Sequence, residues 1–367
     1  MPVAEDLAYF DHAAVAPLSG PAHDAIATWA DEAATRGEAA WASWSGRLQQ
    51  VRHTAAAMVA AEPEEIALVP NTTTGISLVA EGFPWQRGDN VVVPADEFPS
   101  NLYPWMNLAQ RGVETRRVNV EDGRLDLDRL ADACDGRTRI IAASWVGYAS
   151  GWRNDPAELA RVAHDHGALL FLDAIQALGV FPLDVRAAGV DFFAADGHKW
   201  LLGPEGAGLM MIRREHLGRL RPLVVGWNSV VHDHDFSRIE LTLKDSAARY
   251  EGGSQNMAGM HALGASLDLL TGIGIANVAA RLLEVTGRLC ERLGEIGARV
   301  ASDRTGERRS GIVSVDLPGR DLAALRRHAM SRGVVLNHRG GRLRLSPHAY
   351  TSEADIARLI EVLRGGA

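Results

Sequence analysis

The stretch "VDFFAADGHKW", residues 190–200, places a lysine directly after an apolar run. The run is short and apolar at almost every position, which is typical of a strand covered on both faces. Lysine is almost never fully buried without a partner, and a lone lysine usually extends its amine to water. Lys199 at the end of a buried strand therefore needs an explanation from the rest of the sequence.

Short apolar runs alternate with helical patterns from about residue 50 to about residue 225. This alternation predicts an α/β architecture with a mostly parallel sheet. The helical patterns cover residues 72–83 and 155–167, and each ends near a glycine. The other strand candidates are residues 65–70, 90–95, 139–146, 168–174 and 206–212.

The sequence after about residue 260 changes character. A long helical stretch, residues 261–297, is broken near a Gly-Ile-Gly. Shorter strands and helices follow it, which predicts a smaller α+β unit. We expect a large unit over residues 15–250 and a small one over residues 251–367 that also takes in residues 1–14.

Composition narrows the class of protein. The formal net charge of −8 argues against a nucleic-acid surface, and no apolar run has the length of a membrane span. The N-terminus lacks the basic start and apolar core of a signal peptide. Cys134 and Cys290 lie far apart without metal-ligand spacing, which excludes a disulfide framework and fits a reducing cytosol. We expect a cytoplasmic protein without nucleic-acid or membrane partners.

Other site motifs are weak or missing. "HDHD", residues 232–235, has no further His/Asp cluster with ligand spacing near it, so we expect no metal site. We expect His232 and His234 in a polar loop near the mouth of a pocket. The sequence has neither the G-x-G-x-x-G turn of a nucleotide-dependent oxidoreductase nor the G-x-S-x-G turn of a hydrolase.

Three strand ends carry polar residues. Asp173 ends residues 168–173, Lys199 follows residues 190–196, and the threonines 72–74 follow residues 65–70 and begin a helix. Ligands bind at the C-terminal ends of the strands in an open parallel sheet, and a helix N-terminus can hold a phosphate. Asp173 and the threonines could instead only cap helices. A cofactor with an aldehyde, a basic ring nitrogen and a phosphate would use all three, and pyridoxal 5'-phosphate (PLP) fits.

Six stretches, in this order, carry a resemblance to the class V aminotransferase family, PLP-dependent enzymes of fold type I. The chain is similar to its branch of cysteine desulfurases and isopenicillin N epimerase. The resemblance covers nearly the whole chain and implies a large domain with a mostly parallel sheet of the seven-stranded type and a smaller C-terminal α+β domain. The stretches are "YFDHAAVAP" (9–17), "NTTTG" (71–75), "DEFPSN" (96–101), "FLDAIQALG" (171–179), "DGHKWLLGPEGAG" (196–208) and "YEGGSQN" (250–256).

The resemblance implies the roles nearest the cofactor ring. Lys199 would form the Schiff base with the cofactor and then, as a free amine, move the Cα proton of the substrate. That role needs a lowered lysine pKa, which a desolvated site supplies. Asp173 would keep the pyridine nitrogen protonated, and Gln176 would donate a hydrogen bond to the ring oxygen. Phe98 would stack on the ring, where many desulfurases carry a histidine, and Tyr148 aligns with an asparagine that many relatives place near the ring oxygen.

The resemblance also implies how phosphate and substrate are held. Thr73, Thr74 and His198 would bind the phosphate, and Ser254 would reach the phosphate of a partner subunit, so that a homodimer shares its active sites. Arg344 would clamp the substrate carboxylate, a bidentate geometry that guanidinium suits. The remaining expected substrate contacts are His12 and Asn101.

Two departures separate this chain from desulfurases. The stretch "VVLNHRGGRLRLS", residues 334–346, is short and has no cysteine to take up sulfur. Asp196 stands where relatives carry a serine, and we expect its carboxylate to point away from a phosphate.

We therefore predict a PLP-dependent homodimer that acts at Cα or Cβ of a small amino acid, as an aminotransferase or a lyase. The alternatives are an epimerase of the isopenicillin N epimerase type and a non-catalytic PLP-binding relative.

Overall fold

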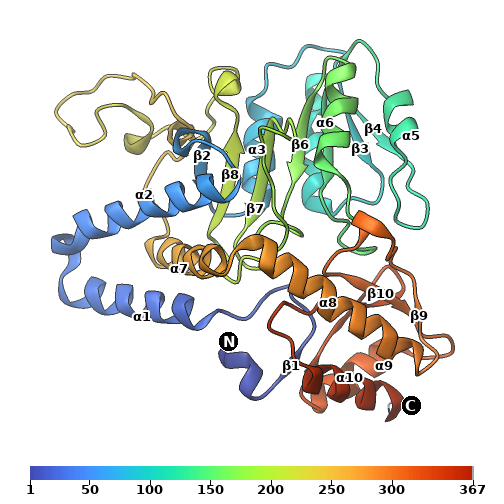
Figure 1. The fold of residues 1–367 in the computed structure, drawn as a ribbon. Helices are drawn as coiled ribbons and strands as arrows, with labels where there is room; N and C mark the ends of the chain where they lie inside the picture. The colour runs from blue at the N-terminus through green and yellow to red at the C-terminus, as the bar shows by residue number, and fades with distance from the viewer. Residues whose placement is uncertain (366–367) are drawn as a thin grey trace.

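The computed structural model describes residues 1–365, and a seven-stranded sheet forms its centre (Figure 1). Strand β8 pairs antiparallel with its neighbours β7 and β2, and the remaining pairs are parallel. The predicted α/β fold with a mostly parallel seven-stranded sheet is confirmed. In spatial order the strands are β2 (Ile66–Val69), β8 (Gly208–Ile212), β7 (Phe192–Asp196), β6 (Leu169–Asp173), β5 (Thr138–Ser144), β3 (Asn90–Pro94) and β4 (Glu114–Val118).

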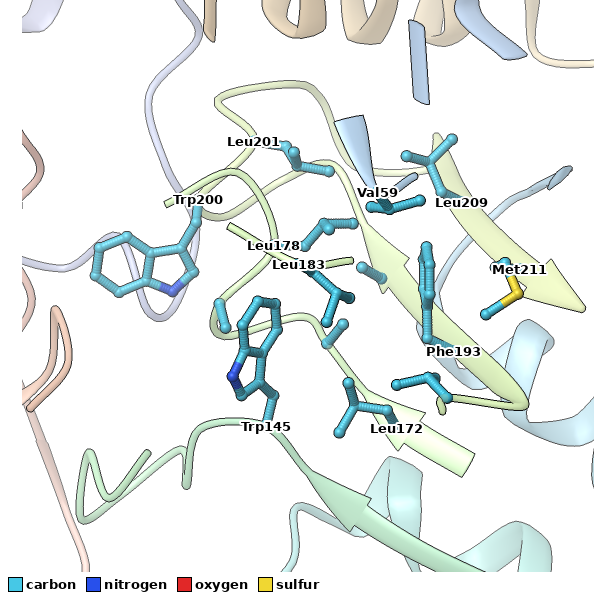
Figure 2. Packing of buried hydrophobic residues seen from close by; sticks show 14 of the residues in the cluster. Val59, Trp145, Leu172, Leu178, Leu183, Phe193, Trp200, Leu201, Leu209 and Met211 are labelled. Carbon is cyan, nitrogen blue, oxygen red and sulfur yellow. The ribbon is translucent and has the colours of Figure 1, made fainter. Parts of the chain in front are cut away.

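Side chains alternate between the two faces of this sheet, as the pleat of a strand requires. Leu172 and Phe193 belong to the cluster that Figure 2 shows, whereas their neighbours Phe171 and Phe192 belong to the cluster on the other face. Because both faces are covered, the central strands are apolar at nearly every position. Strand β4 differs: its sequence "ETRRV" is mostly polar and partly exposed at the sheet edge, so it lacks the apolar run that predicts a buried strand.

Helices cover both faces of the sheet. Helices α2, α6 and α7 contribute to the cluster of Figure 2, and α3 and α4 contribute to the opposite cluster. The predicted long helical stretch is two helices that bend by 82° at Gly274. The helix bounds are α1 (Gly20–Thr35), α2 (Trp41–Met58), α3 (Thr72–Gly82), α4 (Tyr103–Asn107), α5 (Leu127–Asp132), α6 (Pro156–Asp165), α7 (Met257–Ile273), α8 (Ile275–Gly294), α9 (Leu322–Ser331) and α10 (Glu353–Gly365).

The C-terminal part contains a second, four-stranded sheet. The N-terminal strand β1 pairs in parallel with β11, so the start of the chain lies against this part (Figure 1). The domain bounds at residues 15–250 and 251–367 stay a proposal, and residues 366 and 367 lie outside the described part. The strands are β12 (Asn337–Arg339), β13 (Arg342–Leu345), β10 (Val313–Asp316) and β9 (Arg299–Val300) in the sheet, and β1 (Ala8–Tyr9) and β11 (Val334–Val335) in the pair.

Within residues 1–365 no single helix has both the length and the apolar character needed to cross a membrane. The bent pair of α7 and α8 reaches that length and hydropathy only when its two helices are taken together.

Candidate active site

A cavity of about 350 Å³ lies at the C-terminal ends of β6 and β7. Parallel neighbouring strands end at the same edge of a sheet, which brings the residues after them together. The predicted site residues that line the cavity are Thr73, Phe98, Tyr148, Asp173, Gln176, His198, Lys199 and Arg344. The predicted residues outside its lining are His12, Thr74, Asn101 and Ser254.

Lys199 and Asp173 form the charged centre of the cavity. Lys199 is only 8% exposed, and burial lowers the pKa of its amine to about 8 although Asp173 opposes the shift. Burial likewise raises the pKa of Asp173 to about 6, against the N–H of Ile175 and the charge of Lys199. A buried lysine that loses its proton near neutral pH can act as a nucleophile or a base.

Glu97 is a buried acid beside this centre that the sequence reading missed. Its carboxylate accepts the N–H of Ser144 at 2.6 Å and also bonds the Ser144 hydroxyl. Burial raises the pKa of Glu97 to about 8, and Asp173 adds to the shift. The sequence carried a signal for Glu97, because this residue directly precedes Phe98 in the motif "DEFPSN".

Two aromatic rings form one wall of the cavity. The ring of Phe98 is partly exposed and meets the ring of Tyr148 edge to face, with centroids 5.3 Å apart and planes at 73°. The Nζ atom of Lys199 lies 5.6 Å from the centroid of the Phe98 ring. Phe98 is therefore placed to cover a planar group held by Lys199, as its predicted role requires.

The side chain of Gln176 is held on two sides. Its Nε2 donates to the carbonyl oxygen of Ala13 at 3.0 Å, and its Oε1 accepts the indole N–H of Trp200 at 2.8 Å. An amide nitrogen has two N–H groups, so one remains for the predicted contact with a ring oxygen.

The start of helix α3 forms the end of the cavity where a phosphate was predicted. Asn71 caps the helix and accepts both the N–H of Thr74, at 2.8 Å, and its hydroxyl, at 3.1 Å. With these bonds Thr74 lies outside the lining, and its predicted phosphate contact stays a prediction. Thr72 and Thr73 line the cavity instead, and the Thr72 hydroxyl accepts the N–H of Asp196 at 2.9 Å.

Asp196 lies at this end of the cavity, and the expected direction of its carboxylate away from a phosphate stays a prediction. Asp196 lines the cavity, and its Oδ1 accepts the N–H of Gly197 at 2.7 Å. Its Oδ2 lies 2.9 Å from Nδ1 of His198, in a close contact outside hydrogen-bond geometry. The carboxylate is thus held by groups of its own turn, beside the histidine that was predicted to face the phosphate.

Arg344 lies on β13 and reaches the cavity from the C-terminal part of the chain. Its guanidinium is buried, donates from Nη1 to the carbonyl of Tyr148 at 2.9 Å, and donates from Nη2 to Asp11 at 3.2 Å. Its Nε atom has no hydrogen-bond partner within residues 1–365. A buried donor without a partner is costly, and a substrate carboxylate would satisfy it.

His12 and Asn101 do not line the cavity, and their predicted substrate contacts stay predictions. Both ring nitrogens of His12 are engaged, Nδ1 with the carbonyl of Ser346 at 2.9 Å and Nε2 with the hydroxyl of Tyr350 at 2.8 Å. Burial lowers the pKa of this imidazole well below its usual value. Asn101 is fully buried, and its Oδ1 accepts the indole N–H of Trp105 at 3.1 Å, whereas its Nδ2 has no hydrogen-bond partner within residues 1–365.

The predicted loop residues lie elsewhere in the chain. Ser254 and His234 line a separate polar cavity of about 100 Å³, and His232 lines a surface depression beside it. Neither histidine lines the main cavity of its own chain, and their expected place near its mouth stays a prediction. The contact of Ser254 with a partner subunit stays a prediction.

The residues of the main cavity fit PLP. A buried lysine of lowered pKa can bind its aldehyde, and the carboxylate of Asp173 can bind its ring nitrogen. The N-terminus of α3 with the hydroxyls of Thr72 and Thr73 can hold its phosphate. These three features share one cavity.

Comparisons with known proteins match the sequence to one family. The sequence matches the family model for class-V aminotransferases over residues 8–359. A probable cysteine desulfurase of Methanothermobacter thermautotrophicus is 33% identical, and the match covers 99% of this chain and 95% of that protein. A cysteine desulfurase of Cronobacter sakazakii is 36% identical over 63% of this chain and 58% of its own length.

Solved structures show the same fold. The cystine C–S lyase C-DES, solved with its reaction product cysteine persulfide, has a TM-score of 0.92 at 24% identity and covers 100% of this chain and 99% of its own. A lysine-to-alanine variant of C-DES, with glycine covalently linked to its PLP cofactor, has a TM-score of 0.93 at 23% identity, with coverage of 100% and 98%.

Proposed function

The chain belongs to the class-V aminotransferase family of PLP-dependent enzymes, and we propose that it is a lyase that cleaves a bond at Cβ of a small amino acid. The observation that carries the proposal is the shared cavity of Lys199, Asp173 and Arg344. The names of its relatives, cysteine desulfurases, support cleavage at Cβ. The comparisons do not favour the epimerase or the non-catalytic alternative.

Each residue of the cavity would have its own role in the reaction. Bound PLP would supply an electron sink for the negative charge that develops at the substrate Cα. Arg344 would hold the substrate α-carboxylate, and Lys199, whose lowered pKa increases the neutral fraction of its amine, would take the Cα proton. Asp173 would keep a proton on the ring nitrogen through a charge-assisted hydrogen bond. Phe98 and Tyr148 would limit the access of water from one side.

The leaving group would depart as a free small molecule. Cys134, after α5, and Cys290, in α8, are the cysteines of the chain, and neither lines the cavity. Burial raises the pKa of the Cys134 thiol to about 11 and also raises that of Cys290, which makes both poor nucleophiles. The reaction would remove H from Cα and a group X from Cβ, release HX, and leave an enamine that hydrolyses to a 2-oxo acid and ammonia.

Transamination is the second candidate, because Phe98 cannot give a proton to a leaving group. Both reactions would begin with the same proton transfer to Lys199. In transamination the proton would be delivered to the cofactor instead of to a leaving group. The amino group would then stay on the enzyme until a 2-oxo acid accepts it.

Product analysis separates the two candidates. The holoenzyme is incubated with β-substituted amino acids, with and without added 2-oxo acid, and ammonia and 2-oxo acid are measured. A lyase forms ammonia and 2-oxo acid continuously without an added 2-oxo acid, whereas a transaminase without that acceptor stops after one turnover per site. Lys199→Ala is the control and should abolish both products. Absence of either product from a panel of small amino acids would refute the proposal, and interconversion of L and D forms would point to an epimerase.

A further inference from the structure

Two guanidinium groups line the main cavity, and their surroundings differ. Arg344 is buried and forms an ion pair with Asp11 at 3.2 Å. Arg339, at the end of β12, is exposed, and its Nη1 bonds the side-chain oxygen of Asn337 at 3.1 Å and the carbonyl of His338 at 3.0 Å. Within residues 1–365 no carboxylate lies within ion-pair distance of Arg339. The cavity therefore presents a cation without an ion-pair partner of its own, and the carboxylate that acts with it is that of Asp11, already paired with Arg344.

A short hydrogen-bond network connects the two guanidiniums. Arg339 donates to Oδ1 of Asn337, and Nδ2 of Asn337 donates to Oδ2 of Asp11 at 2.9 Å. The other oxygen of Asp11 accepts from Arg344. The hairpin of β12 and β13 fixes the spacing, since Asn337 lies opposite Arg344 and Arg339 lies opposite Arg342. The network thus holds a second cation in register with the predicted carboxylate clamp.

From this arrangement we infer that the substrate carries a second anionic group, at the end of its β-substituent, and that Arg339 binds it. The inference rests on the proposed function, in which Arg344 holds the α-carboxylate. Since Asp11 already balances Arg344 and Asp173 faces Lys199, Arg339 is the cation left for a distal group. The substrate class is an amino acid whose β-substituent ends in a carboxylate or a similar anion.

A matched pair of ligands tests the inference. S-Carboxymethyl-L-cysteine and S-carbamoylmethyl-L-cysteine have nearly the same shape, but only the first has a distal charge. Each is titrated into the holoenzyme, and the dissociation constant is read from the visible spectrum of the bound cofactor. We expect the acid to bind about 3- to 10-fold more tightly than the amide, a modest ratio because Arg339 is exposed. Added salt should reduce that ratio.

Two arginine variants of the same hairpin complete the test. Arg339→Gln should remove the preference for the acid, whereas Arg342→Gln should keep it, because Arg342 bonds Asp316 and does not line the cavity. Equal affinity of wild type for the two ligands, or a preference that survives in Arg339→Gln, would overturn the inference alone. If neither ligand changes the spectrum, the proposed function fails, and the inference that rests on it fails as well.

Discussion

The indole N–H of Trp200 donates a hydrogen bond to the side-chain oxygen of Gln176, with 2.8 Å between the two atoms. Trp200 follows Lys199 directly and is fully buried in the cluster of Figure 2. Gln176 lies three residues after Asp173. The bond therefore ties the turn after β7 to the turn after β6 and holds Lys199 in place relative to Asp173.

We expect Lys199 to be the lysine that binds the cofactor. Reduction of the holoenzyme with borohydride followed by peptide mass mapping should find the pyridoxyl group on Lys199. Lys244, the other lysine of the chain, is a built-in control, since its amine is paired with Asp233 at 2.7 Å. A pyridoxyl group on Lys244 would contradict the assignment.

Cofactor uptake by the apoenzyme should depend on pH. Only the neutral amine attacks an aldehyde, and burial lowers the pKa of Lys199 to about 8. The fraction of neutral amine therefore falls about tenfold for each pH unit well below 8. The rate of PLP recombination, followed by visible absorbance, should rise with pH and level off above about 8. A rate that does not change between pH 6 and pH 9 would show that Lys199 is not the attacking amine.

Asp173→Asn should weaken the electron sink. Loss of one charge-assisted hydrogen bond to the ring nitrogen costs about 1.5–3 kcal/mol, which corresponds to one to two decades in rate. The variant should retain part of its cofactor and lose most of its turnover, as measured by kcat and by cofactor absorbance in parallel. Turnover at the wild-type rate would refute the role of Asp173.

The centre of the site could be predicted from sequence because the sheet imposes it. Buried parallel strands are recognisable by their apolar runs, and their ends must meet at one edge, which placed Asp173 and Lys199 together. Strand β4 lacks this signal because it is polar and lies at the edge.

Side-chain direction within the motifs could not be predicted in the same way. His12, Thr74 and Asn101 lie in matched motifs but outside the cavity lining, and His12 and Thr74 use their polar side-chain atoms in bonds to nearby protein groups. Asp196 was expected to turn away because a carboxylate and a phosphate repel each other. Its hydrogen bond from Gly197 and its contact with His198 are set by a turn geometry that motif spacing does not reveal. Arg339 was missed because one arginine among several in a short hairpin carries no pattern of its own.

Neither cysteine should be needed for activity. A Cys134→Ser, Cys290→Ser double variant should keep its turnover, because both thiols lie outside the cavity and have raised pKa values. Activity of the variant and its cofactor content are compared with those of wild type. Lost turnover in a variant that still binds cofactor and melts at the wild-type temperature would show that a thiol takes part.

Assembly should be linked to cofactor binding through Ser254. Ser254 lies outside the Lys199 cavity of its own chain, in the polar cavity that also includes Arg52 and Glu251. If its hydroxyl reaches the phosphate of a partner subunit, each site is complete only in the dimer, and dilution should release cofactor. A hydroxyl bond to a charged acceptor contributes about 1.5–3 kcal/mol, so Ser254→Ala should weaken cofactor affinity by one to two decades.

Equilibrium dialysis gives the affinity, and sedimentation gives the assembly state. Ser45→Ala is the control, since Ser45 lines the same polar cavity but lies outside the matched motif. A protein that sediments as a monomer while fully loaded with cofactor would refute the shared site.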